Sequence, residues 1–365
     1  MSNLAPFTLL LLVKGRHEFT ERWLKYMDSI KFEFPIIIAD GENDGVTEDL
    51  IKKANTSKNL AIEFYQYNTH GGYNEYYSMK YEALNKVKTD YVMLCDNDDF
   101  ILQYGLKKLI DFAVKNPEYI SVSGKILNFE IDDFAYAPFG SKINFLKPCE
   151  YYRKEEPLDD WKNHIKSVFT EFQPNFYNIF QKKYLLIVAN ELTKLNFSDL
   201  VINEFYIQLR TATLGKSKVL DAEQHYLRQR GTSSISKNYV FSEDLIRCNM
   251  PLDVRKMADE ISKLISLGDD KLKADIENCI LDSFAKYLNH FLAHTTLRYR
   301  FKRLYEFKQK LLYIYKNYFF FFRFLNKKIL ENIFFKNLTK SIKIEDSGKL
   351  KNELFNIKSF LSSGK

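Results

Sequence analysis

The chain has 365 residues, 45% of them hydrophobic, so it is long enough to bury a sizeable core and, by length, to form two domains. Its 54 lysines and arginines against 47 aspartates and glutamates give a net charge of +7, which suits phosphorylated ligands or an anionic membrane and does not indicate nucleic acid. No uncharged run reaches the roughly 18 residues of a membrane-spanning helix. The four cysteines are widely spaced and indicate neither zinc nor disulfides, so we expect a cytoplasmic protein.

Apolar runs of strand length alternate with helically spaced segments in the N-terminal part of the chain. We predict strands over residues 7–14, 34–40, 60–67 and 90–96, and helices over residues 20–30, 46–55 and 74–87. Thr47 is the expected N-cap of the second helix. The first apolar run has no basic residue before it and no cleavage site after it, which favours a buried strand over a signal peptide. This order predicts an α/β fold, a mostly parallel sheet with helices on both faces.

Carboxylates follow two of these strands. Asp40 ends the second strand, and Asp96-Asn97-Asp98-Asp99 follows the fourth. Carboxylates crowded beside a buried strand repel each other, so they either turn the chain into solvent as an Asp/Asn-rich turn or hold a cation. Ligands of parallel sheets bind outside the carboxyl ends of the strands, where both groups would lie.

Downstream the pattern is less regular. We predict a helix over 100–117, a strand over 118–131 and an irregular, aromatic insertion over 131–175. Ser198 as N-cap and Gly215 as the stop enclose a further helix, which a short strand at 218–220 follows. From Pro251 onwards the chain is helical and basic. We therefore expect a catalytic-type α/β domain over 1–240 and a helical C-terminal extension over 241–365.

Three stretches resemble family 2 nucleotide-sugar glycosyltransferases of the bacterial type, which have the Rossmann-related GT-A fold. They are LLLVKGRHEFTERWLKYM, IIIADGENDG and YNTHGGYNEYYSMKYEALNKVKTDYVMLCDNDDF. The resemblance covers residues 7–100 well and 118–230 loosely, and it does not extend to the C-terminal third. Two departures are KGRHE, where the family commonly has Asn-Arg-Pro, and Met79-Lys80, where it often has an arginine.

This resemblance implies an inverting glycosyltransferase of the hexosyltransferase class. The donor would be a nucleotide-sugar, in the first place a UDP-sugar, and the acceptor a hydroxyl of a glycan or lipid-linked glycan of the cell envelope. Asp96 and Asn97 would contact the nucleotide-sugar, and Asp98 would hold Mn²⁺ or Mg²⁺, which neutralises the leaving diphosphate. The other candidates for the nucleotide-sugar are Val13, Lys14, Arg16, Asp40, Gly72 and Lys80.

Each of these candidates has a plainer alternative. Asp40 suits ring N–H groups or ribose hydroxyls, but it could simply turn the chain at a strand end. Arg16 either contacts the diphosphate or is solvated, and Lys80 either reaches a phosphate or is a surface lysine. Gly72 belongs either to a plain loop or to a backbone that approaches the nucleotide closely.

The general base is expected on the helix after Ser198, by the same resemblance. Asp199, the preferred candidate over Glu204, lies in its first turn, where a carboxylate also stabilises the helix dipole. Glu204 has a spacing to Gly215 nearer to that of the family. Further on, His225, Arg228 and Arg230 could meet a phosphate or metal from below, with His225 as the candidate metal ligand, although a lone histidine is more often structural.

Residues 311–340 combine an aromatic block with interleaved lysines and arginines. This composition suits a helix in the interface of an anionic membrane, so the protein could be peripheral on the inner face of the cell membrane. The alternative is a helix packed on the catalytic domain or on a partner in a homo-oligomer. Two other functions also stay open: a catalytically inactive nucleotide-sugar-binding partner protein and a sugar nucleotidyltransferase.

Overall fold

The computed structural model describes residues 6–54, 59–69, 72–131, 137–146, 160–170, 175–230, 250–300 and 344–364. Its elements, in chain order, are β1 (Phe7–Val13), α1 (His17–Ser29), β2 (Ile36–Asp40), α2 (Val46–Ala54), β3 (Ile62–Gln66), α3 (Tyr73–Lys86), β4 (Tyr91–Cys95), β5 (Phe100–Ile101), α4 (Gln103–Lys115), β6 (Tyr119–Ile131), β7 (Ile143–Leu146), α5 (Trp161–Thr170), β8 (Ile179–Gln181), α6 (Lys182–Leu195), α7 (Leu200–Leu214), β9 (Lys216–Gln229), α10 (Met250–Ser266), α11 (Asp270–Arg300) and α14 (Ile344–Ser363).

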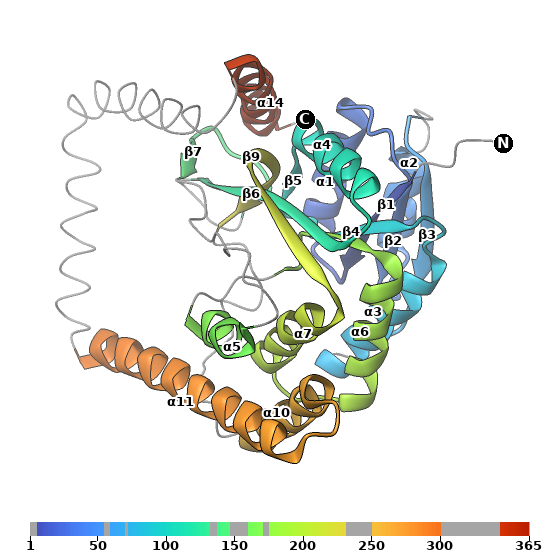
Figure 1. Ribbon diagram of the computed structural model, residues 1–365. Helices are drawn as coiled ribbons and strands as arrows, with labels where there is room; N and C mark the ends of the chain where they lie inside the picture. The colour runs from blue at the N-terminus through green and yellow to red at the C-terminus, as the bar shows by residue number, and fades with distance from the viewer. Residues whose placement is uncertain are drawn as a thin grey trace.

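A nine-stranded sheet runs through these residues in the order β3-β2-β1-β4-β8-β6-β9-β5, with β7 paired to β6 (Figure 1). β1 pairs in parallel with both β2 and β4, and β2 pairs in parallel with β3. Antiparallel pairs begin where β4 meets β8 and include β5 with β9, while β6 and β9 are again parallel. The predicted α/β fold with a mostly parallel, helix-flanked sheet is confirmed.

β1 is buried along its whole length because helices cover both faces of the sheet. Leu9 and Leu11 pack in a cluster that includes Trp23 of α1 and residues of α4. The alternate residues Leu10 and Leu12 pack in a separate cluster with side chains of α3 and α6. Alternate residues of the continuous apolar run therefore point to opposite faces of the sheet, and each set is buried on its own face.

The strand order reverses at β1. β2 and β3 extend the sheet on one side of it, while β4 lies on the other. The carboxyl ends of β1, β2 and β4 thus meet at a topological switch point, which is the usual ligand-binding edge of such sheets. Val13, Asp40 and Cys95 are the last residues of these three strands.

Several predicted details were wrong. α2 begins at Val46, whose N–H donates to Asp44 Oδ1, so Thr47 lies inside the helix and is not its cap. The N-cap of α7 is Asp199, while Ser198 N and Oγ both donate to Asp253 Oδ2 of α10. The strand expected at 218–220 is the long β9, and the insertion at 131–175 contains β7 and α5. The pattern also did not reveal β5 and β8, because short strands carry little periodic signal. The 14-residue helix α6 was not predicted either.

The helices after residue 250 pack on the α/β part of the chain. Side chains of α10 and α11 share a core cluster with α5, α6 and α7, and those of α14 join the cluster that contains β1. Figure 1 shows α14 at the opposite end of the molecule from α10 and α11. Within the described ranges, no helix is long and apolar enough to cross a bilayer. The aromatic and basic stretch at 311–340 lies outside those ranges, and the division at residue 240 stays a prediction.

Gly105 sets how closely α4 approaches β9. A Cβ atom placed on this residue would lie 1.7 Å from the main-chain oxygen of Gln224. Because the obstacle is sheet backbone, we expect Gly105→Ala to lower the free energy of unfolding by about 3 kcal/mol or more. In the matched control, Gly348→Ala of α14, a Cβ meets nothing within 4 Å, so alanine should be neutral or stabilising by about 0.5–1 kcal/mol. Urea unfolding of both variants checks this, and equal midpoints would contradict the expected clash.

Candidate active site

The sequence Asp96-Asn97-Asp98-Asp99, here called the carboxylate loop, follows β4 at the switch point. One carboxylate oxygen from each of its three aspartates lies within 4.8 Å of the other two. Burial, and next the charge of Asp98, raises the pKa of Asp96 to about 6. The same two causes raise the pKa of Asp99 well above its usual range. The loop therefore concentrates negative charge where water screens it poorly.

Two arginines of the first loop and helix bind this loop. Arg16 Nη2 lies 2.9 Å from Asp98 Oδ2, and Arg22 Nη2 donates to Asp98 O at 2.5 Å. Arg16 has the left-handed conformation (φ 57°) at the N-cap of α1, a strained geometry for a non-glycine residue. Arg22 is fully buried, and burial lowers its pKa to about 9. Sequence reasoning missed Arg22, although it lies on the apolar face of α1 with Phe19, Trp23 and Tyr26, where an arginine is unusual.

The remaining contacts of the loop come from distant parts of the chain. Tyr177 Oη donates to Asp96 Oδ2 at 2.9 Å, and Gln229 N donates to Asp99 Oδ1 at 2.8 Å. Asn97 Nδ2 donates to Thr20 Oγ1 of α1 at 2.9 Å, so this buried amide is directed at the protein. Neither Tyr177 nor Gln229 carries a sequence signal, since only the pairing of β6, β8 and β9 brings them here.

Oxygen donors of this kind fit a hard divalent cation. Mg²⁺ and Mn²⁺ take one or two carboxylates together with phosphate oxygens and water. The clustered aspartates supply those carboxylates. Burial, and next the charge of Asp98, raises the pKa of Asp96 and of Asp99, and a bound cation would favour their charged forms. Asp96 and Asp98 are thus suited to bind it.

His225, predicted as a metal ligand, is not part of this group. Its side chain is fully buried beside β6, and Nε2 is 2.8 Å from the main-chain oxygen of Tyr177. Burial lowers its pKa to about 4, so the ring is neutral at physiological pH. These contacts favour the structural role of a lone histidine.

The candidates for the nucleotide lie along the ends of β1 and β2. Val13 O accepts a hydrogen bond from Gly41 N, and Lys14 Nζ donates to Thr69 O. Asp40 is buried, which raises its pKa, and its Oδ1 accepts from Glu42 N at 2.9 Å. Gly72 is exposed at the N-cap of α3 with φ 141°, a conformation that favours glycine, while Gly71 lies outside the described residues.

A second group of acceptors adjoins Asp40. The metal-ligating atoms of His17, Glu42 and Asp44 lie within 4.8 Å of one another, with His17 Nε2 3.2 Å from Asp44 Oδ2. The side chains of His17 and Asp44 are partly exposed. The end of β2 is therefore rich in groups that accept hydrogen bonds.

Glu204 of α7 is electrostatically linked to the carboxylate loop. Burial raises its pKa to about 7, the charges of Arg228 and Lys80 lower it, and the charges of Asp199 and then Asp96 raise it. Lys80 is itself buried rather than on the surface, which lowers its pKa to about 8, and its Nζ lies 5.6 Å from the centroid of the Tyr77 ring. The fold thus brings together residues of α3, α7 and β9 that are far apart in the sequence.

Asp199, the other candidate base, has a different environment. Its Oδ1 accepts hydrogen bonds from Val201 N at 2.8 Å and Ile202 N at 3.1 Å, as an N-cap does. The side chain is only 1% exposed. A buried cap is a sufficient structural reason for an aspartate at this position.

Comparison with known proteins identifies the fold. No protein-family model matches the chain, and neither does any curated protein. Residues 1–349 of TarS from S. aureus align with 76% of this chain and 71% of their own, at 14% identity and a TM-score of 0.50. TarS in complex with UDP-GlcNAc (15%, TM-score 0.49) and the mannosyltransferase PcManGT from Pyrobaculum calidifontis with GDP-Man and Mn²⁺ (12%, TM-score 0.40) are further matches. At 14% identity this likeness shows the fold alone, so the chain shares the α/β fold of TarS residues 1–349.

Proposed function

We propose that the protein is an inverting glycosyltransferase of family 2 that transfers a sugar from a nucleotide-diphosphate donor, in the first place a UDP-sugar, to a hydroxyl of a glycan or lipid-linked acceptor. The observation that carries this proposal is the position of the carboxylate loop at the switch point of the sheet. The buried Glu204, whose pKa burial raises to about 7, lies among the charges of Arg228, Lys80, Asp199 and Asp96. A metal-binding group and a carboxylate of raised pKa are the two parts that such a transfer needs.

On the donor side, the ends of β1 and β2 would bind the nucleoside. Asp40 and the main chain at Val13 supply acceptors for ring N–H groups and ribose hydroxyls. Asp96 and Asp98 would hold Mn²⁺ or Mg²⁺, which would supply positive charge to the diphosphate. Arg16, which here pairs with Asp98, is close enough to the same carboxylates to exchange that partner for a phosphate oxygen.

On the acceptor side, Glu204 would act as the general base. The acceptor oxygen bonds to the anomeric carbon while the bond from that carbon to the diphosphate breaks, and its electron pair leaves with the diphosphate. Glu204 takes the proton of the attacking hydroxyl. A pKa near 7 gives a base that is ionised in part of the molecules at neutral pH yet basic enough to accept a proton.

A thermal-shift screen of UDP, GDP and ADP with and without Mn²⁺ tests the donor half of the proposal. A ligand at 100 times its Kd stabilises the folded state by about 2.7 kcal/mol, so we expect a raised Tm for UDP that requires the metal. Stabilisation by no nucleotide would overturn the proposal. Binding of a nucleotide-sugar without transfer to any acceptor would favour the inactive partner, and pyrophosphate release from a nucleoside triphosphate and a sugar phosphate would favour the nucleotidyltransferase.

A further inference from the structure

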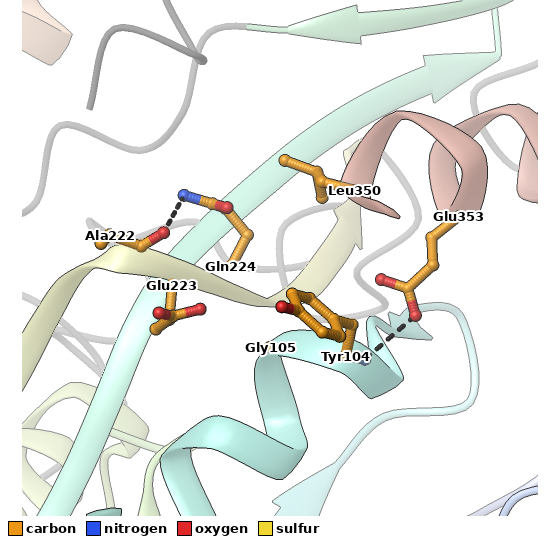
Figure 2. Close-up of a pocket in the computed structure, with 7 residues that line it drawn as sticks. All are labelled: Tyr104, Gly105, Ala222, Glu223, Gln224, Leu350 and Glu353. Carbon is orange, nitrogen blue, oxygen red and sulfur yellow. Dashed lines mark hydrogen bonds between the residues drawn. The ribbon is translucent and has the colours of Figure 1, made fainter. Parts of the chain in front are cut away.

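The C-terminal helix α14 is far from the carboxylate loop in sequence but packs directly behind it. Leu354, Ile357 and Leu361 of α14 are buried in the same core cluster as Phe100, the residue that follows Asp99. Glu353 Oε1 accepts a hydrogen bond from Tyr104 N at 3.1 Å, at the start of α4 (Figure 2). The N-cap residue of α4, Leu102, has no side chain that could do this, so α14 caps α4 from outside.

One route from α14 to the carboxylate loop passes through aromatic rings. The Phe360 ring lies 6.3 Å from that of Phe100, edge to face, and 5.9 Å from that of Tyr26. The guanidinium carbon of Arg22 lies 4.8 Å from the centroid of the same Phe100 ring. Arg22 in turn donates to the main-chain oxygen of Asp98. Phe360 therefore supports the ring on which the buried arginine rests.

A second route passes through residues 137–140. Gly140 N donates to Leu361 O at 3.2 Å, and the Phe139 ring lies 5.8 Å from that of Phe360. The neighbouring Pro138 O accepts from Arg22 Nη1 at 2.7 Å, so the segment held by α14 also fixes Arg22. Gln229, whose N–H binds Asp99, is fixed there as well, because its Nε2 donates to Ala137 O at 3.0 Å.

We propose that α14 is a positioning element of the active site, in which Phe360 holds the carboxylate loop in place through Phe100, Arg22 and the 137–140 segment. Both routes converge on the groups that bind Asp98 and Asp99. Neither Phe360 nor any other residue of α14 needs to touch substrate for this role. The consequence for metal binding rests on the proposed function, whereas the ordering of the loop does not.

Native-state hydrogen exchange of full-length Phe360→Ala tests the positioning. Loss of the ring removes support from Phe100, so we expect the amides of residues 97–101 to exchange about 10-fold faster while those of β1 and β2 keep their rates. Phe355→Ala is the matched control, because Phe355 is on the same helix but 67% exposed. It should leave all these rates unchanged. Unchanged exchange at 97–101 in Phe360→Ala, or equal acceleration throughout the chain, would overturn the proposal.

Phe360→Leu is a milder second variant, which keeps the test possible if Phe360→Ala does not fold. Leucine keeps much of the apolar volume but not the ring edge, so it should accelerate exchange at the same amides to a smaller extent, and no acceleration would count against the proposal.

A titration of Mn²⁺ in the presence of UDP adds a functional measurement. Partners of metal ligands typically contribute about 10–100-fold in affinity, so Phe360→Ala, one step further out, should weaken Mn²⁺ binding by about 3–10-fold. If the wild-type protein binds no Mn²⁺ with UDP, the proposed function fails, and hydrogen exchange still decides the role of α14.

Discussion

Glu204→Gln should abolish glycosyl transfer and leave the affinity for the nucleotide-sugar almost unchanged. Glutamine keeps the size and polarity of the side chain but cannot accept the proton of the acceptor hydroxyl. Removing a general base typically costs about 10²–10⁴-fold in rate. Because this contact matters mainly in the transition state, kcat and kcat/KM should fall together. Product formation at saturating donor, with donor Kd measured in parallel, checks both parts.

The pH profile gives a second test of Glu204. Burial raises its pKa to about 7, so the carboxylate that acts as base is protonated below this pH. The rate should therefore rise as the pH increases through about 7 and level off above it. A glutamate with the usual pKa would give this rise in rate near pH 4. A rate that stays constant between pH 5 and 8 would assign the base to another residue.

Asp199→Asn is the control for this prediction, since Asp199 is the other candidate from the sequence. Its side chain caps α7 through Val201 N and Ile202 N. Asparagine is about as good an N-cap, so stability and activity should both stay close to wild type. Loss of transfer in Asp199→Asn with full activity in Glu204→Gln would move the role of base to Asp199.

Asp98→Asn should abolish the metal dependence of nucleotide binding without unfolding the protein. The change removes one of three clustered carboxylates and one partner of Arg16, but it keeps the main-chain oxygen that Arg22 binds. Outer partners of metal ligands already contribute about 10–100-fold in affinity, so loss of a ligand itself should cost at least ~100-fold. Calorimetric titration of UDP with and without Mn²⁺ measures this. Asp111→Asn, on the exposed side of α4, should bind as the wild type does.

Acidification should also weaken metal-dependent nucleotide binding by the wild-type protein. This loss should begin at a higher pH than ordinary aspartates would give. The pKa of Asp96 is raised to about 6 by burial and by Asp98, so protons compete with the metal for this carboxylate below that pH. Metal-dependent binding should weaken as the pH falls from about 7 to 5, whereas isolated aspartates would lose their charge only near pH 4. Undiminished metal dependence at pH 5, or in Asp98→Asn, would show that the carboxylate loop is not the metal site.

The sequence alone determined the first half of the fold, because its signals there are local. The apolar run at β1, the ends of β2 and β4 and the helices between them follow from periodicity and from the turns that punctuate it. A parallel sheet brings the carboxyl ends of its strands to one edge, so the positions of Asp40 and Asp96 at two strand ends were enough to predict that both lie at that edge.

Tertiary structure decided the rest, since it depends on contacts between residues distant in the sequence. Asp199 and Glu204 lie on one predicted helix, and only packing made the first a buried cap and placed the second near Lys80, Arg228 and Asp96. Arg22 reaches Asp98 across 76 positions, and Glu353 caps α4 across 249. A pKa, a cap or a support of this kind arises from burial and neighbouring charge, and these are properties of the packed chain that no local sequence pattern encodes.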